Sequence, residues 1–562
     1  MYSLRSVRDS QVPRKVSVKM FSSLATASRR SVVATICAIA LGLSACGTDS
    51  NTEEVKEIYF GYALDEPLLT TNAGTNLGVS VNAQALAGRL YPSAHVPGPK
   101  GQLIPNSDFV NTQVLPGTSQ RVIYNISNDA KYSDGKQVTC DSYLLAFTAG
   151  AMPDLFDSHL PLMEQVDRVE CSPGSKQATV VFKEGFGARW RQLFGPGVLM
   201  PAHAIADKLG MTLEDFNAAL QSRDAEAIAP IADLWKNGFS LDNFDPLLQV
   251  STGPYKIEKV GDSGEVVLAR NENYVGEPAE LEKIVVWPKG ADLAALAAEN
   301  SIQVVEATSV NGNDWFDRNA TDNQFEIRSQ AGVLTEQLFL SNADVFADKS
   351  ARAAFAACVD QAKIASVSSE YSGVPVDPVA SRTVRASDPA ASQMRDITDP
   401  HLAVNIEAAQ LITGSTIRVG YAGPNDRLAA MVQAMNESCQ PAGITVVDVS
   451  SEAGSLGNLS KLSYGQWGEV IYTAGTADAF IQAVDPMSEF ASIAQTSTDL
   501  QAIRAAEAAS WDEVSTIPLA SQPRVFITHR GVENEVSNTD ASGIGWNMNK
   551  WKFTPPTTDQ DS

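Results

Sequence analysis

Short apolar runs alternate with amphipathic segments along the chain from Glu57 onward. Apolar residues three and four apart predict helices over 79–90, 350–363 and 427–440. Runs rich in β-branched and aromatic residues predict strands over 57–63, 121–126, 178–182, 265–269, 416–421 and 443–447. This alternation is typical of an α/β protein. At about 150 residues per domain, the length allows about three domains or two large lobes.

The first 45 residues have the pattern of a secretory signal. Arg29 and Arg30 precede an apolar stretch over 31–43, and small residues follow it. The sequence Leu43-Ser44-Ala45-Cys46 resembles the lipobox of bacterial lipoproteins, in which the cysteine carries a diacylglyceryl group and becomes the first residue. We therefore expect a cleaved signal peptide over 1–45 and a lipid on Cys46.

A lipid on Cys46 would place the protein outside the cytoplasm. We expect it to be exported and anchored to the outer face of the cytoplasmic membrane, with residues 46–56 as a polar tether. Met20 is an alternative start, since residues 20–45 alone form a complete signal.

The charge balance excludes one class of partner. The chain has 42 Lys and Arg against 66 Asp and Glu, a formal net charge of -24. Such a field repels phosphate backbones, so we expect no nucleic-acid partner. After Cys46 no run of about 20 apolar residues occurs, so we expect no membrane-spanning segment in the mature chain.

Signatures of catalysis are missing from the sequence. The chain has no HExxH, GxSxG, GxxxxGK[ST] or GxGxxG pattern. The histidines are scattered at His95, His159, His203, His401 and His529. We therefore expect a protein that is not an enzyme and that holds no cofactor and no metal.

Four cysteines remain once the signal and the lipidated residue are set aside: Cys140, Cys171, Cys358 and Cys439. Export makes disulfides permissible, and four cysteines allow three pairings; buried free thiols are the alternative. Their wide spacing, with no histidine nearby, disfavours a zinc site.

A series of motifs resembles the family-5 extracellular solute-binding proteins, the receptors of peptide, oligopeptide and nickel importers. Residues 130–143, AKYSDGKQVTCDSY, are similar to the family's signature block. Later blocks follow in the family's order: LMPAH at 199–203, STGPYK at 251–256, RNENY at 270–274, ARAAFAACVD at 351–360 and IPL at 517–519. Each block is weak alone, but their order across residues 57–530 is specific.

The resemblance implies a two-lobed α/β fold of the periplasmic-binding-protein type, the large family-5 form of class II, with a hinge between the lobes. Lobe I would span 57–307, lobe II 308–512, and residues 513–562 would return to lobe I and form the C-terminal tail. The ligand, a peptide or similar solute, would be enclosed as the lobes close. The implied partners of this monomer are ABC permease subunits, which work with separate ATPase subunits.

The resemblance also nominates ligand-binding residues. Peptide-binding members carry a Trp shortly before an Asp that receives the peptide's α-ammonium. The matching Asp here is Asp478, but Gly475 stands where the Trp is expected. Asp478 could instead be a solvated loop acid or a helix cap. Trp315, Tyr421 and Trp467 are aromatic candidates for the cleft, with burial in a core as the alternative.

The lobe assignment selects one disulfide pairing, because Cys140–Cys171 and Cys358–Cys439 each fall within one lobe. The same fold also allows a second function. Actinobacterial relatives are linked to the assembly of mannosylated phosphatidylinositol glycolipids, and the missing Trp favours that alternative. We therefore expect a lipid-anchored receptor of an ABC importer, with a non-transport envelope protein as the alternative.

Overall fold

The computed structural model describes residues 59–464, 468–490 and 499–554. The expected signal peptide, Cys46 and its tether, Trp467, and the end of the C-terminal tail lie outside the described residues. Among the residues that are described, no helix has the length and hydropathy needed to span a membrane.

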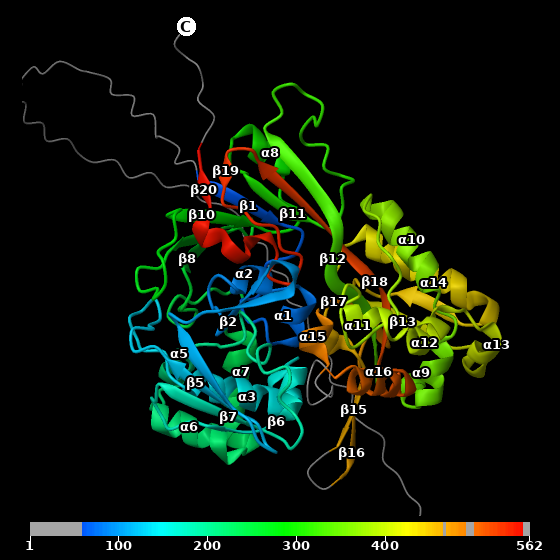
Figure 1. The fold of residues 1–562 in the computed structure, drawn as a ribbon, viewed down its shortest axis with the longest axis horizontal. Helices are drawn as coiled ribbons and strands as arrows, with labels where there is room; N and C mark the ends of the chain where they lie inside the picture. The colour runs from blue at the N-terminus through cyan, green and yellow to red at the C-terminus, as the bar shows by residue number, and fades with distance from the viewer. Residues whose placement is uncertain (1–58, 465–467, 491–498, 555–562) are drawn as a thin grey trace, which may run out of the picture. The chain divides into compact units, whose positions relative to one another are not determined.

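A ten-stranded mixed sheet runs through the described chain (Figure 1). Two long antiparallel strands lie at its centre, β12 (Phe325–Leu340) and β18 (Thr516–His529). One flank, in order outward from β18, is β11 (Val304–Ala307), β1 (Phe60–Leu64), β10 (Lys283–Trp287), β9 (Val266–Arg270) and β8 (Tyr255–Val260). The other flank, outward from β12, is β17 (Ala479–Val484), β13 (Thr416–Gly420) and β14 (Thr445–Asp448).

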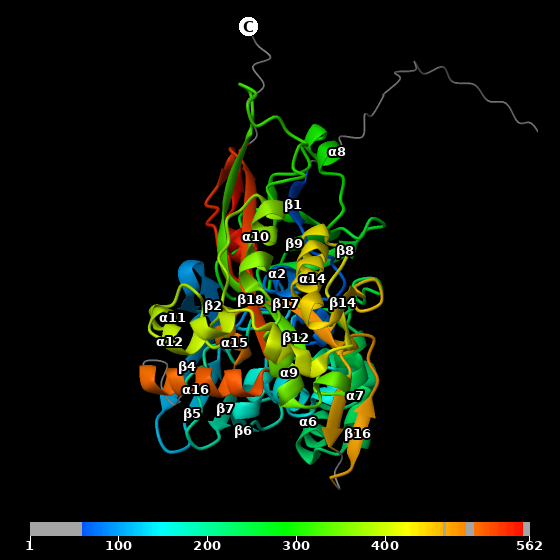
Figure 2. The same cartoon turned by 90° about the vertical axis from the view of Figure 1, so that its right-hand side faces the viewer.

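The two central strands connect two lobes, and both views show them side by side (Figures 1 and 2). The C-terminal end of β18 pairs with β11, and the C-terminal end of β12 pairs with β17. Because β12 and β18 are antiparallel, these two ends lie at opposite ends of the strand pair. We call the half that contains β1 lobe I and the half that contains β17 lobe II. The register of β12 against β18 shifts between Ala331 and Thr335. The expected lobe boundaries at 308 and 512 stay predictions.

Lobe I carries further strands and helices. A four-stranded sheet contains β4 (Val110–Leu115), β5 (Arg121–Ile126), β7 (Gln177–Phe182) and β6 (Val166–Glu170). Two short antiparallel pairs join β2 (His95–Gly98) with β3 (Gln102–Pro105) and β19 (Val532–Glu533) with β20 (Lys552–Phe553). Its helices are α1 (Asn76–Ser80), α2 (Gln84–Ala87), α3 (Asp141–Ala151), α4 (Pro153–Phe156), α5 (Ala202–Leu209), α6 (Leu213–Ser222), α7 (Ala225–Asn237) and α8 (Leu293–Ala298). The main apolar core of this lobe packs helices α2 to α7 against both sheets.

Lobe II has its own apolar core, in which α9, α10 and α14 pack on its part of the large sheet. Its helices are α9 (Lys349–Ala356), α10 (Gln361–Ser372), α11 (Pro389–Ser392), α12 (Arg395–Thr398), α13 (Ile406–Ala409), α14 (Asp426–Cys439), α15 (Pro486–Glu489) and α16 (Leu500–Glu513). A hairpin pairs β15 (Lys461–Tyr464) with β16 (Val470–Thr473). Separate cores allow each lobe to move as a body about the crossing strands.

Two predicted helices are interrupted, and each break has a local cause. The segment 79–90 forms α1 and α2 instead, because Asn82 between them has a left-handed φ of 46°. The segment 350–363 forms α9 and α10, because the Asp360 side chain accepts from the Lys363 backbone N–H and starts a new helix.

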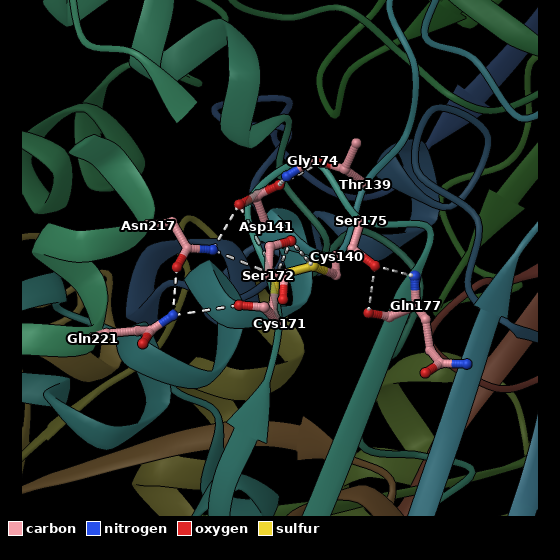
Figure 3. The surroundings of a disulfide bond; sticks show 10 residues. All are labelled: Thr139, Cys140, Asp141, Cys171, Ser172, Gly174, Ser175, Gln177, Asn217 and Gln221. Atoms are coloured by element: carbon pink, nitrogen blue, oxygen red, sulfur yellow. Dashed lines mark hydrogen bonds between the residues drawn. A yellow bond between two sulfur atoms is a disulfide. The ribbon is translucent and has the colours of Figure 1, made fainter. Parts of the chain in front are cut away.

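Both expected disulfides are present, and each lies within one lobe: Cys140–Cys171 in lobe I and Cys358–Cys439 in lobe II. Figure 3 shows the polar surroundings of the first. The buried carboxylate of Asp141 accepts from Asn217 Nδ2 at 2.8 Å and from the Gly174 N–H at 2.9 Å. Neither bond joins one lobe to the other, so neither restrains the hinge.

Candidate functional site

A cavity of about 170 Å³ lies between the lobes. Lobe I supplies its walls from the α1–α2 region, the β2–β3 hairpin, residues 159–162 and residues 191–198. Lobe II supplies Arg385 and residues 483–489, which join the end of β17 to α15. Ligand sites in proteins are commonly concave spaces between domains.

Much of the lining is apolar. The apolar side chains come from both lobes and include Val79, Leu103, Leu160, Leu162, Leu193, Val198 and Val484. A ligand enclosed here would therefore bury carbon-rich surface, while a small number of polar groups would set its orientation.

Charged side chains also line this cavity. The Arg385 guanidinium forms two hydrogen bonds with the Asp485 carboxylate, at 2.9 and 2.6 Å. Asp485 also caps the first turn of α15 by accepting from the Met487 N–H. Burial raises the pKa of Asp540 to about 6, although the Ser542 N–H and the Asn538 amide donate to it. Arg191 also lines the cavity, with its guanidinium 4.5 Å from the Trp190 ring centroid.

Direct contacts join the lobes around this cavity. His159 Nε2 of lobe I lies 3.0 Å from both carboxylate oxygens of Glu489 in lobe II. The buried guanidinium of Arg189 donates to the carbonyl oxygens of Pro486, Phe490 and Thr383 at 2.7–3.2 Å. The lobes are therefore in a closed arrangement.

A second cavity, of about 50 Å³, lies next to the first on the side of the crossing strands. Asn82 and Ala483 line both cavities. Its walls include four charged side chains (Asp65, Glu66, Glu336 and Arg427) and the amides of Gln482 and Gln522. Glu336 and Arg427 form a buried ion pair, with Arg427 Nη1 2.9 Å from Glu336 Oε2. This cavity is more polar than the first.

The carboxylate of Asp478, the expected ammonium acceptor, is already bound by Arg418. Its carboxylate accepts from Arg418 Nε at 3.0 Å, Arg418 Nη2 at 2.6 Å and the Arg418 backbone N–H at 2.9 Å. Only 4% of Asp478 is exposed. It lines neither interlobe cavity, because it precedes the part of β17 that reaches them.

The nominated aromatic residues are also outside the two cavities. Tyr421 is 2% exposed in the lobe II core, and its hydroxyl bonds Asp448. Trp315 packs against Phe316 and Phe325 in a cluster at the lobe I end of the crossing strands, with ring centroids 4.6 and 4.8 Å apart. The described residues thus do not bring Asp478, Tyr421 and Trp315 together at one site.

Sequence reasoning missed the residues that do line the cavities, chiefly Glu66, Gln482 and Asp485. One local signal was available. Asp485-Pro486 follows an apolar strand, and Asp before Pro is a common start of a helix at the end of a strand. Glu66 and Gln482 carry no comparable local signal, because only the packing of the lobes places them on one cavity.

Comparison with known sequences identifies a family and long relatives. The family model for bacterial extracellular solute-binding proteins, family 5 middle, matches residues 119–488. An uncharacterised lipoprotein of Mycobacterium tuberculosis is 31% identical over 529 residues, covering 87% of this chain and 92% of the relative. One from Mycobacterium leprae is 29% identical over 556 residues, covering 92% and 97%.

Solved structures share the fold. The oligopeptide-binding protein AppA of Bacillus subtilis, in complex with a nonapeptide, matches with a TM-score of 0.62 at 14% identity, covering 88% of this chain and 98% of that one. NikZ of Campylobacter jejuni, in complex with Ni(L-His), matches with a TM-score of 0.59 at 13% identity, covering 89% and 100%. At these identities the likeness extends to the two-lobed fold alone.

Proposed function

Since the chain belongs to family 5 of the bacterial extracellular solute-binding proteins, we propose that it is a lipid-anchored extracytoplasmic receptor of an ABC importer. It captures a peptide or similar small solute between its lobes and delivers that solute to a permease. Members of the family generally bind their ligands without converting them, and the same is proposed here.

The observation that carries this proposal is the cavity between lobes I and II. Its walls come from both lobes, so a bound solute would contact both and favour the closed arrangement. The contacts of Arg189 and of His159 with lobe II exist only while the lobes are together. Closure around a solute would remove water from its polar ends and strengthen their electrostatic interactions.

The lipid anchor and the transport partners complete the proposal. The long relatives are lipoproteins, and Cys46 ends a lipobox-like sequence. The two acyl chains of a diacylglyceryl group are sufficient for stable anchoring. The receptor would work with membrane permease subunits and separate ATPase subunits, because the chain itself carries no phosphate-loop motif.

A thermal-shift experiment on the purified protein tests the solute class. A pool of short alanine- and leucine-containing peptides is compared with the mannosylated phosphatidylinositol headgroup. A peptide present at about 100 times its dissociation constant should stabilise the protein by about 2.7 kcal/mol. If the headgroup raises the melting temperature and the peptide pool does not, the transport proposal fails and the envelope function replaces it.

A further inference from the structure

The Glu66 carboxylate lines the second cavity without a partner of its own. Within the described residues no hydrogen bond or ion pair reaches either of its side-chain oxygens. The residue follows β1 at the lobe I wall of that cavity. A carboxylate in an enclosed space is costly unless a cation or hydrogen-bond donors meet it.

The other acids on this cavity are already paired. Asp65 accepts from Thr308 Oγ1 at 2.7 Å and lies 3.2 Å from Lys289 Nζ. Glu336 is held by Arg427. Glu66 is thus the one carboxylate among the described lining residues that is free to meet a cation from outside the chain.

Two buried amides on the same cavity also have unused polar atoms. Gln482 is 7% exposed; its Nε2 donates to the Val79 carbonyl at 2.9 Å, while no described residue donates to its Oε1. Gln522 is 6% exposed; its Oε1 accepts from Arg524, while its Nε2 has no acceptor among the described residues. The cavity therefore offers a free carboxylate and a free amide oxygen.

We propose that Glu66, with Gln482 Oε1, receives a primary ammonium group of the ligand in this second cavity. The inference rests on the proposed function and names the recognition chemistry of its site. A primary ammonium carries three donors and a compact charge, which suit one carboxylate and one amide oxygen. A divalent metal ion would need more oxygen ligands than these two residues supply. The rest of the ligand would extend past Ala483 into the larger, apolar cavity.

This assignment moves the cation site to the opposite lobe from Asp478, whose carboxylate is filled by Arg418. On β17 the position that faces the second cavity carries the neutral Gln482, so lobe II supplies no free acid there. The acid comes from lobe I instead, and the ammonium would bridge the lobes through Glu66 and Gln482. Ligand binding and lobe closure would then be coupled by one charged group.

The charges around Glu66 give the site a pH signature. Burial, with the nearby Asp65 and Glu306 charges, raises the pKa of Glu66 to about 8, although Lys289 and Arg524 act to lower it. The Arg427–Glu336 pair faces the cavity from lobe II. Near neutral pH the empty site therefore holds a proton, and an arriving ammonium would displace it.

The experiment compares two probes on three proteins. The probes are the pool of short alanine- and leucine-containing peptides with free amino termini and the same pool acetylated at those termini. The proteins are the wild type, E66Q, and the control E184Q, which changes an exposed glutamate that lines neither cavity. Melting of the unliganded proteins, followed by circular dichroism, checks that each variant is folded.

The free-terminus pool should raise the melting temperature of the wild type and of E184Q, and the acetylated pool should not. E66Q should bind the free pool about 30-fold more weakly or worse, since removing one side of an enclosed charge pair has costs of that size. Calorimetry near pH 7 in buffers of different ionisation enthalpy should detect a released proton with the wild type and none with E66Q.

Two results overturn the inference in distinguishable ways. If both pools stabilise the wild type equally, or if E66Q responds like E184Q, the receptor function stands and the Glu66 assignment is wrong. If neither pool stabilises the wild type, the peptide-receptor function fails and the inference falls with it.

Discussion

Asp478 and Glu66 are both acids, but their surroundings give them different roles. Asp478 accepts three hydrogen bonds from Arg418, so its charge is neutralised within lobe II. The Glu66 carboxylate lines a cavity and has no hydrogen bond or ion pair within the described residues. The first arrangement stabilises a lobe, and the second leaves a group that a ligand can satisfy.

The Asp478→Ala substitution should therefore reduce stability and leave binding intact. Removing the carboxylate leaves the Arg418 backbone N–H without its acceptor and leaves the guanidinium only the Gly475 carbonyl oxygen. We expect a loss of about 1–3 kcal/mol in the free energy of unfolding. The stabilisation by the peptide pool should stay close to that of the wild type. Urea unfolding with and without the pool measures both, and an unchanged stability with a lost ligand effect would restore Asp478 as the ammonium acceptor.

The stability of the unliganded protein should depend on pH through Glu66. The folded-state pKa is raised from 4.5 to about 8. Between these values the folded protein keeps a proton that the unfolded chain has released. The free energy of unfolding, relative to E66Q, should thus fall by up to about 1.4 kcal/mol per pH unit as pH rises through this window. Urea unfolding of both proteins at several pH values measures the difference, and a pH-independent difference would contradict the burial of this carboxylate.

At the scale of elements, local pattern predicted most of the secondary structure and little of the site. The strands β5, β7 and β13 and the helix α14 were predicted within a residue or two, because their periodicity is local. The breaks at Asn82 and Asp360 depend on one backbone conformation and one cap. Arg418 lies 60 positions before Asp478 in sequence, so their pairing could not be read from either segment alone.

Gly332 lies in β12 where this strand packs closely against β18. A Cβ on Gly332 would lie 2.9 Å from the Gln522 carbonyl oxygen and 2.8 Å from Arg524 Cγ on the neighbouring strand. Gly332→Ala should therefore destabilise the protein by about 1–3 kcal/mol through overpacking at the crossing. Gly454→Ala is the matched control, because nothing lies within 4 Å of its Cβ position. Equal melting temperatures for the two variants would mean that the crossing tolerates the added methyl group.

At the scale of the whole molecule, the lobes are held by contacts that titrate. Burial alone would lower the pKa of His159, but the charge and hydrogen bond of Glu489 raise this pKa above its usual value. The charge of Lys461 acts to lower it, and the Phe339 ring packs edge-on against the imidazole. Because the pKa of His159 is raised, the His159–Glu489 contact stabilises the closed lobes fully at a pH below the ordinary histidine pKa of 6.5. This stabilisation is lost as pH rises through the raised pKa. Deprotonation of Glu66 near pH 8 also weakens lobe closure as pH rises.

Closure of the unliganded protein should therefore weaken from about pH 6 to above the raised pKa of His159. Small-angle scattering should record a larger radius of gyration at the higher pH. The Glu489→Gln variant removes the charge that raises the pKa of His159 and should lose most of this pH dependence. A wild-type radius that does not change with pH, or a variant with the full change, would exclude the His159–Glu489 contact as a pH-sensitive link between the lobes.

In the proposed receptor a solute is bound in the space between the two lobes. Native mass spectrometry of the wild type and of Ala483→Phe, both incubated with the peptide pool, tests it most directly, because Ala483 lines both cavities. We expect one bound solute per wild-type chain, and little or none on the folded variant, where the ring fills the space. Equal occupancy of the two proteins, or no bound solute on the wild type, would contradict it.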